Sequence, residues 1–344
     1  PLKTAEWLFK PCNGMVRWYS NVNKKKFSIG YYNISAKKNL KLQTKEGQVT
    51  SADYWTHTDF MDDIAAVSVD GVWNFYNREG SVLKSGYKNI YKGTTCGLWQ
   101  AKKSDGSIDY FNVSGEPVFE DSGYTGIFFP RDYQGTDFSL IGAEKGGKWG
   151  LINKENKMII PFEYEQVNDC RYGCVQVKNN GKWGLVSLQN QTIVPLDYVG
   201  LGAVMKENPT TVCVNKADKL WYIYNVKQKK EVGKGYTSVG YFNDGLAWAR
   251  PADMKVENNT LYRALSDGED PESENFGYVI DESGQELISA PVPTKKMTEI
   301  CEWMKRTGYH VLTPMETRRL LLKLSVHQRH YPMDEKISES EWDY

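Results

Sequence analysis

The residues best suited to acid–base or metal chemistry gather around His57. Asp53, Asp59, Asp62 and Asp63 place four carboxylates within six residues of its imidazole. Such a set could hold a divalent metal ion or supply a general acid and base. The repeat described below predicts a surface turn at this point, which favours a polar loop over a reactive site.

Two other pairs of residues could take part in metal binding or redox chemistry, but they lack the further residues that such a site needs. His327 and His330 could share a helix face, yet two ligands without a third are weak grounds for a metal site. Cys170 and Cys174 fit buried apolar positions better than a redox pair. No serine or cysteine has a recognisable base, and no phosphate-binding glycine motif occurs. We therefore predict no catalytic residue, no metal ligand and no cofactor, and expect a protein that is not an enzyme.

The charge of the chain limits its partners. Its 344 residues include 43 lysines and arginines and 43 aspartates and glutamates, so the formal net charge is zero. Residues 1–50 are nevertheless basic and residues 267–286 acidic, which we interpret as solvated faces or as ends that match each other. The zero balance argues against nucleic acid as a partner, and no apolar run is long enough for a membrane-spanning helix.

Cysteine usage and the first residues suggest a compartment. Six cysteines are scattered without a disulfide framework, in a chain long enough to fold without such bridges. The segment Pro1–Thr4 lacks the pattern of a secretory signal. We expect reduced thiols and a cytoplasmic protein.

An internal repeat organises most of the chain. The segment Lys148–Asn153, KWGLIN, recurs as KWGLVS in Lys182–Ser187 and as LWYIYN in Leu220–Asn225. After each of the first two comes a polar turn, an apolar run that ends in proline, and a segment with tyrosine and valine. The first two tryptophans lie 34 residues apart and the third follows after 38, which is the spacing of a repeat protein.

Weaker copies extend the repeat in both directions. Upstream they are Leu40–Gln43, Val72–Asn77 and Ile108–Asn112, the last with isoleucine in place of tryptophan, and downstream Phe276–Asp281. These copies give seven units, and Arg17–Ser20 leaves an eighth open.

The residues of this unit resemble the WG-repeat family of bacterial proteins. The resemblance extends over residues 17–290 and is strongest over residues 148–250. It implies a repeat scaffold and assigns no catalytic residue. The residues that define the repeat are Trp73, Trp149, Gly150, Trp183, Gly184 and Trp221.

The sequence of each repeat predicts a small antiparallel β-meander. Three short β-runs are separated by polar turns with glycine or asparagine, which suit tight hairpins. One such ribbon cannot bury its apolar face alone and must stack on its neighbours. We expect the tryptophan to pack between ribbons and the glycine to allow a close approach of the backbone.

The whole array is all-β and could close in two ways. Radial ribbons would form a β-propeller-like toroid of about seven blades, and linear stacking would form an open β-solenoid. We favour the toroid, because it hides the strand edges without capping units. The predicted domains are a β-repeat domain over residues 1–292, a helical extension over residues 293–333 and an acidic tail over residues 334–344.

The parts outside the repeat are candidates for binding. Residues 251–275 form an insertion, and we interpret the acidic stretch of residues 267–286 as a solvated surface loop or an acidic docking segment. Beyond residue 293 the pattern predicts one helix over residues 294–308 and a second that begins at Thr313–Pro314. Candidate partner-binding residues are Trp303, Arg318 and Arg319 on these helices and Trp342 in the tail.

Three hypotheses on function come from this organisation. The first is a non-enzymatic repeat scaffold for protein–protein interaction, as an accessory or regulatory subunit of a bacterial complex. The second is a carbohydrate-binding or cell-wall-binding repeat protein that uses exposed aromatic rings. The third is a hydrolase with its site near His57.

Overall fold

The computed structural model describes residues 5, 7–21, 27–44, 47–48, 57–61, 63–91, 97–266 and 275–326. Outside this part lie several residues singled out from the sequence, namely Asp53, Asp62, residues 267–274 of the acidic stretch, His327, His330 and Trp342. The chain divides into two compact units. Unit 1 comprises Pro1–Arg131 and Phe138–Glu163, and unit 2 comprises Asp132–Asp137 and Tyr164–Tyr344.

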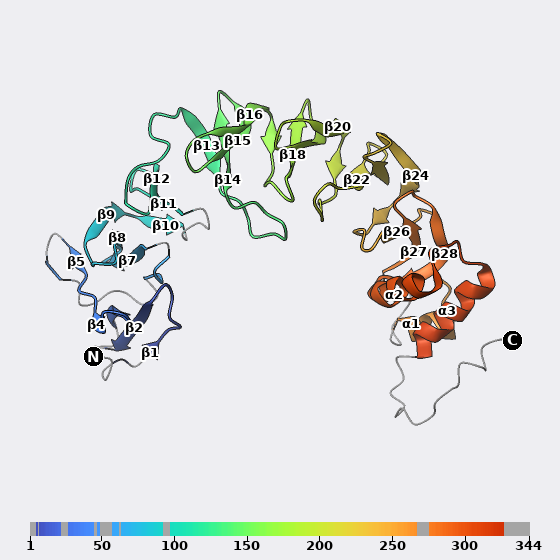
Figure 1. Cartoon of the computed structure of the whole chain (residues 1–344), viewed down its shortest axis with the longest axis horizontal. Helices are drawn as coiled ribbons and strands as arrows, with labels where there is room; N and C mark the ends of the chain where they lie inside the picture. The colour runs from blue at the N-terminus through green and yellow to red at the C-terminus, as the bar shows by residue number, and fades with distance from the viewer. Residues whose placement is uncertain are drawn as a thin grey trace. The chain divides into compact units, whose positions relative to one another are not determined.

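Unit 1 contains four antiparallel sheets of three or four strands within its described residues (Figure 1). The first sheet consists of β1 Trp7–Leu8, β2 Met15–Asn21, β3 Phe27–Asn33 and β4 Lys38–Asn39. The next two consist of β7 Ala65–Val69, β8 Val72–Tyr76 and β9 Val82–Tyr87, and of β10 Asn89–Tyr91, β11 Leu98–Lys102 and β12 Ile108–Asn112. The last consists of β13 Tyr124–Phe128, β14 Leu140–Lys145, β15 Lys148–Asn153 and β16 Met158–Tyr164. A short pair, β5 Gln43–Thr44 and β6 Gly47–Gln48, stands apart.

Unit 2 contains three four-stranded sheets and the helices, again within the described residues. The first two sheets consist of β17 Gln166–Val167, β18 Cys174–Asn179, β19 Lys182–Ser187 and β20 Thr192–Tyr198, and of β21 Gly200–Leu201, β22 Thr211–Asn215, β23 Trp221–Asn225 and β24 Lys230–Tyr236. The third consists of β25 Ser238–Val239, β26 Leu246–Arg250, β27 Phe276–Asp281 and β28 Glu286–Pro293. The helices are α1 Thr260–Leu265, the 3-10 turn η1 Thr294–Lys296, α2 Met297–Thr307 and α3 Pro314–Val326.

The predicted fold class is confirmed for the individual units of the repeat. Seven antiparallel sheets of three or four strands, each joined in sequence order, are followed by C-terminal helices. A four-stranded antiparallel sheet of this kind is the form of a propeller blade. Closure of such sheets into a toroid stays a prediction. No helix in the described part is long and apolar enough to cross a membrane.

The turn after each middle strand explains the polar residue that ends the repeat motif. The side chain at this position accepts the backbone N–H four residues later, as in a local Asx-type turn. The donor and acceptor pairs are Ser81 to Asn77 (2.8 Å), Glu116 to Asn112 (3.0 Å), Lys157 to Asn153 (2.8 Å), Gln191 to Ser187 (3.3 Å) and Gln285 to Asp281 (2.9 Å). Five sheets thus share one hairpin, which fixes where the outer strand begins.

A tryptophan of the middle strand lies opposite a tyrosine of the outer strand in three sheets. The pairs are Trp73 with Tyr87, Trp183 with Tyr198 and Trp221 with Tyr236. The register shifts beside each pair, so the outer strand carries a β-bulge there. The tryptophans are half-buried and the tyrosines are buried. Trp149 is also half-buried, and its ring centroid lies 5.6 Å from that of Phe128.

The glycine after the tryptophan makes room for this bulge. A Cβ atom at Gly150 would lie 2.5 Å from a backbone carbonyl oxygen of the outer strand, and one at Gly184 would lie 2.8 Å from the equivalent oxygen. In β23 the same position holds Tyr222, and the space comes from Gly235 opposite, where a Cβ would lie 2.8 Å from the tyrosine ring. Each of the three sheets therefore has one glycine where the middle and outer strands approach each other closely.

Successive sheets within each unit share hydrophobic cores, as the stacking argument requires. In each of five clusters, buried residues come from two neighbouring sheets. The clusters join Tyr31 with Val67, Phe75 with Trp99, Leu98 with Ile141, Leu185 with Val214, and Ile223 with Ile280. Each sheet thus completes its core with residues of the next.

The tyrosine that ends an outer strand also makes a polar link to the next sheet. Its hydroxyl donates a hydrogen bond to a side chain of that sheet, or of a turn within it, in four places. The pairs are Tyr87 to Asp109 (2.9 Å), Tyr164 to Asn190 (2.6 Å), Tyr198 to Glu231 (3.3 Å) and Tyr236 to Glu286 (3.2 Å). We call these four residues the linking tyrosines. Tyr124 of β13 makes a similar hydrogen bond within its own sheet, to Asn156 at 2.6 Å.

The position of the first repeat along the chain differs from the prediction. Leu40–Gln43 is not a middle strand, and this part of the prediction is wrong. The middle strand of the first sheet is β3, and its last four residues are Gly30–Asn33. A Cβ atom at Gly30 would lie 2.5 Å from the Trp18 ring of β2. Since β3 has no tryptophan of its own, the motif that reveals the other units is absent from it.

Candidate functional site

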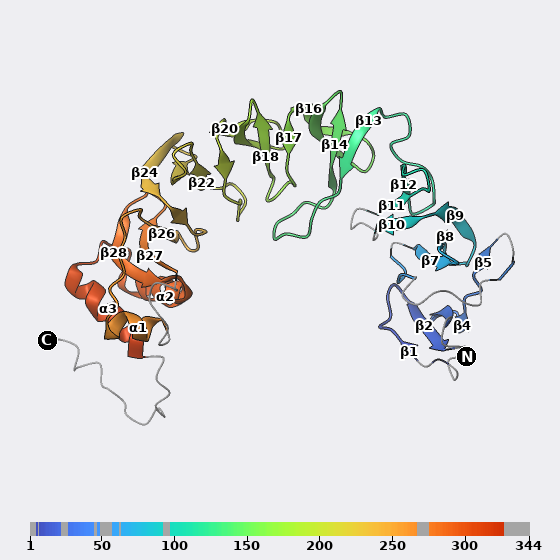
Figure 2. The same cartoon turned by 180° about the vertical axis from the view of Figure 1, so that it is seen from behind.

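The C-terminal helices pack on the last sheet and share one core with it. In Figures 1 and 2 they lie beside β27 and β28 in both views. Helix α2 buries one face through Ile300, Cys301 and Met304, and α3 buries its own through Leu320, Leu321 and Leu324. These side chains join a cluster that includes Phe276, Val279, Ile288 and Val292 of the sheet.

The ends of the two helices are fixed by specific contacts. Thr313 and Glu316 form a capping box at the start of α3, with the Glu316 carboxylate 2.8 Å from the Thr313 backbone nitrogen. These hydrogen bonds lower the pKa of Glu316. After α2, the Tyr309 hydroxyl donates to the Asp244 carbonyl at 3.2 Å, and the Lys305 ammonium pairs with the Asp244 carboxylate at 2.6 Å. Both helices therefore have a defined position on the sheet.

The exposed side of α3 combines apolar and basic side chains. Met315 is 65% exposed and Leu322, two turns later, is 47% exposed. Arg318 and Arg319 lie between them and are also exposed. We call these four residues the outer face of α3. Two exposed apolar side chains beside two guanidinium groups have the composition of a protein-binding surface.

A cavity of about 680 Å³ adjoins this surface, between α1 and the first turns of α3. Its apolar lining includes Leu261, Leu312 and Leu321, and Arg318 lies at the same cavity. This volume is within the range of small ligand pockets, so a side chain of a partner could enter it.

The structure brings together two of the four residues predicted to bind a partner. Arg318 and Arg319 share the outer face of α3, whereas Trp303 lies on α2, half-buried against the common core. Trp342 lies outside the described residues. The sequence analysis missed Met315 and Leu322, although their seven-residue spacing places them on the same side of a helix as Arg318.

Helix α1 lies within the insertion of residues 251–275, where no helix was predicted. Asn259 caps α1 by accepting the Tyr262 backbone N–H at 3.1 Å, and Leu265 is fully buried in the common core. Leu261 and Leu265, four residues apart after an asparagine, are the signal that could have predicted this helix.

His57 is buried, so its predicted place in a surface turn is wrong. It is 6% exposed, and its ring centroid lies 5.6 Å from that of Tyr19 and 6.5 Å from those of Phe9 and Tyr31. Burial, aided by the positive charge of Arg17, lowers the pKa of His57 to about 4. Neither ring nitrogen has a hydrogen-bond partner among the described residues.

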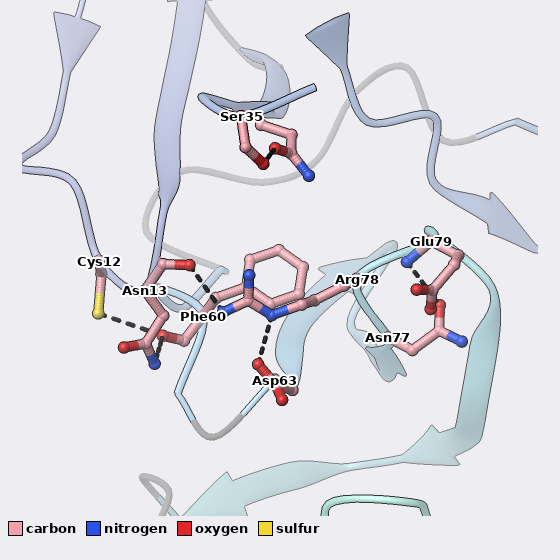
Figure 3. Close-up of polar contacts among 9 residues, drawn as sticks. Cys12, Asn13, Ser35, Phe60, Asp63, Asn77, Arg78 and Glu79 are labelled. Atoms are coloured by element: carbon pink, nitrogen blue, oxygen red, sulfur yellow. Dashed lines mark hydrogen bonds and ion pairs between the residues drawn. The ribbon is translucent and has the colours of Figure 1, made fainter. Parts of the chain in front are cut away.

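The carboxylates near His57 are engaged by arginines. Asp59 forms an ion pair with Arg17, with its carboxylate oxygen 3.0 Å from the Nε atom, and Asp63 forms an ion pair with Arg78. Arg78 also donates to the Asn13 carbonyl at 2.7 Å and so ties this loop to the first sheet (Figure 3). Among the described residues, no group of three or more His, Cys, Asp or Glu residues could hold a metal ion.

Cys170 and Cys174 are buried, as expected for small apolar residues. Burial raises the pKa of Cys170 to about 12 and also raises that of Cys174. Both thiols therefore stay protonated near neutral pH, which leaves little of the reactive thiolate.

Comparison with known proteins identifies the repeat in one segment. The model of the "WG containing repeat" family matches residues 149–183, from the first tryptophan of the KWG motif to the second. The chain therefore contains a WG repeat, and the resemblance noted from the sequence is confirmed over residues 149–183. No curated protein matches the sequence.

Several solved structures are distantly similar to the chain. Hsv2 of Kluyveromyces lactis is 10% identical with a TM-score of 0.30, over 69% of this chain and 86% of its own. A eukaryotic initiation factor is 11% identical with a TM-score of 0.35, over 79% and 74%. PorZ of the type-IX secretion system of Porphyromonas gingivalis is 12% identical with a TM-score of 0.24, over 65% and 31%. At these scores the similarities carry no conclusion about function.

Proposed function

We propose that this chain is a non-enzymatic WG-repeat scaffold that binds another protein through the outer face of α3 and the adjoining cavity. The observation that carries the proposal is the exposure of Met315 and Leu322 on either side of Arg318 and Arg319. The opposite side of the same helix is fixed in the core. A partner would therefore meet a preformed surface, which reduces the entropy lost on binding.

The composition of this surface indicates the chemistry of the partner. Arg318, Arg319 and Lys323 are exposed on one helix and favour acidic side chains in a bound segment. The apolar pair Met315 and Leu322 favours apolar side chains one or two helical turns apart. We expect an amphipathic segment with acidic residues beside its apolar positions, in a complex where this chain acts as an accessory or regulatory subunit.

The test is co-purification from the source cell with tagged variants of the full chain. The paired change Met315→Ser and Leu322→Ser, and separately Arg318→Glu, should each reduce recovery of a stoichiometric partner at least about tenfold, the scale of one interface hot spot. Lys227→Glu and Val199→Ser change exposed residues elsewhere in unit 2 and should leave recovery unchanged. Equal recovery with all variants would remove α3 from the account.

Point substitutions are preferable to deletion of residues 294–344. The predicted domain boundary after residue 292 implies that such a deletion spares the β-structure. In the structure, Ile300 and Leu321 share a core with Phe276 and Val292. Deletion would expose this side of the last sheet, and loss of binding would then have two explanations.

The hydrolase hypothesis receives less support from the geometry. His57 lies among aromatic rings, and the neighbouring Asp59 and Asp63 are held by arginines. A lowered pKa leaves His57 neutral at pH 7, but a general base must also contact the proton that it removes. We also propose a cytoplasmic location, because the six cysteines are scattered without a disulfide framework.

A further inference from the structure

A second cavity, in unit 1, lies where one repeat departs from the pattern of the others. It has a volume of about 410 Å³ and lies between β12 and β13, which are neighbours in Figure 1. Its lining includes Asp109 and Tyr110 of β12, Phe119 and Glu120 of the following turn, and Tyr124 of β13. This site is independent of the proposed function of α3.

The departure from the repeat explains why space is left here. Ile108 occupies the position of the repeat tryptophan, and Asp109 occupies that of the glycine. A smaller side chain thus replaces the indole that pairs with a tyrosine in three other sheets. The space is not closed by an outer strand, because the sheet of β10, β11 and β12 has no fourth strand among the described residues.

The outer segment leaves the sheet in a strained turn. Pro117 still bridges to β12 and Val118 still donates to the Tyr110 carbonyl, but Phe119 then has φ +67° and Asp121 φ +58°. Positive φ is unusual for a bulky residue and tends to occur where function maintains it. The Ser122 hydroxyl donates to the Phe119 carbonyl at 2.6 Å and stabilises the turn.

The turn brings three aromatic rings together at the cavity. The Phe119 ring centroid lies 6.0 Å from that of Tyr110 and 6.0 Å from that of Tyr124. All three rings are partly exposed. They provide flat apolar surface next to polar groups, as an amphipathic ligand requires.

The polar groups at the cavity are charged and partly fixed. Asp109 accepts the Tyr87 hydroxyl at 2.9 Å and the Lys103 ammonium at 2.7 Å, so its carboxylate is held in one orientation. A carboxylate can accept about four hydrogen bonds, which leaves lone pairs for a ligand. Glu120 and Lys84 add an exposed acceptor and a half-buried donor.

We propose that this cavity binds an uncharged sugar ring of a glycan. A pyranose has an apolar C–H face that can lie against an aromatic ring, and hydroxyl groups that can both donate and accept. The rings of Tyr110 and Phe119, the carboxylates of Asp109 and Glu120 and the ammonium of Lys84 match these two requirements.

The test is a titration of the full chain with cellohexaose and with chitohexaose, followed by calorimetry and by the tyrosine fluorescence. We expect saturable binding of at least one of them. Glu120→Ala should weaken that binding about tenfold, the effect of one hydrogen bond to a charged group. The matched control Glu79→Ala, in the turn of the preceding repeat, should leave it unchanged.

A second variant separates the aromatic contribution from folding. Tyr110→Leu keeps apolar volume but removes the ring face, so binding should fall at least tenfold. Urea unfolding of each variant verifies that it is folded, and Glu120→Ala, at an exposed position, carries the test if Tyr110→Leu does not fold. No binding of either sugar, or binding that both folded variants retain, would overturn the proposal. Binding confined to an aromatic peptide control would overturn it in favour of a protein ligand.

Discussion

At the scale of single residues, the glycine of the repeat motif has a steric role that can be tested. A Cβ atom at Gly184 would lie 2.8 Å from the Val194 carbonyl oxygen, so the outer strand would have to shift. We predict that Gly184→Ala destabilises the protein by about 1–3 kcal/mol, the usual cost of overpacking. Urea unfolding monitored by circular dichroism measures this change.

Gly200→Ala is the matched control for this prediction. A Cβ there would meet its nearest neighbour at 3.7 Å, an ordinary contact, and the φ angle of this residue is not in the left-handed region. Its unfolding midpoint should be unchanged or slightly raised. Equal losses for both variants would show that the close crossing at Gly184 is not the cause.

His57 provides a prediction on pH. Its folded-state pKa of about 4 is below the ordinary value of 6.5. The contribution of the neutral imidazole to the stability of the folded protein is therefore complete above pH 6.5 and is lost as the pH falls toward 4. We expect the imidazole resonances of His57, assigned by their absence in His57→Gln, to titrate with a midpoint near 4. A midpoint near 6.5 would show that this ring is not buried as described.

At the scale of elements, the linking tyrosines predict how stability depends on alkaline pH. Burial raises the pKa of Tyr198 and Tyr236 above the ordinary value of 10, and their glutamate partners raise it further. The contribution of these protonated phenols to the stability of the folded protein is therefore complete below about pH 10 and is lost as the pH rises beyond it. The urea midpoint should fall above pH 10, and it should fall less steeply in Tyr236→Phe.

The same variant should also lose stability at pH 8. Removal of the hydroxyl ends its hydrogen bond to Glu286, which is worth about 1.5–3 kcal/mol for a charged acceptor. Tyr241→Phe, at a position that is 63% exposed, serves as the control and should behave as the wild type. Identical unfolding of the two variants would contradict a role for the linking tyrosines between sheets.

Elements that carry the repeat motif could be predicted from the sequence. Trp149, Trp183 and Trp221 revealed three middle strands, and the Thr313–Pro314 pair revealed the start of α3. The first sheet was misplaced because β3 carries Gly30 without a tryptophan of its own. Local signals predict such elements only where the sequence repeats them.

The candidate sites depend on contacts that one sequence does not display. His57 was placed in a turn, since nothing local shows that Tyr19 and Tyr31 surround it. Arg318 and Arg319 were recognised as basic residues of a helix, but the exposure of Met315 beside them depends on how α3 packs. The cavity near Tyr110 likewise depends on the turn at Phe119, whose positive φ has no clear sequence signal.

At the scale of the whole molecule, closure of the blades remains a prediction with a direct measurement. A compact toroid of this length should have a radius of gyration near roughly 20 Å, and an open solenoid should have a clearly larger one. Small-angle scattering of the monomeric chain distinguishes the two forms. A value well above 20 Å would reject the toroid that we favour.

The central claim of this account is that each sheet depends on its neighbours for stability. Leu185 of one sheet and Val214 of the next share a core, as do Ile223 and Ile280. The most direct test compares a fragment of residues 164–344 with a single sheet of residues 166–201, by urea unfolding and amide NMR dispersion. We predict a cooperative transition for the longer fragment and an unfolded single sheet. A cooperative transition with dispersed amide resonances in residues 166–201 alone would contradict the claim.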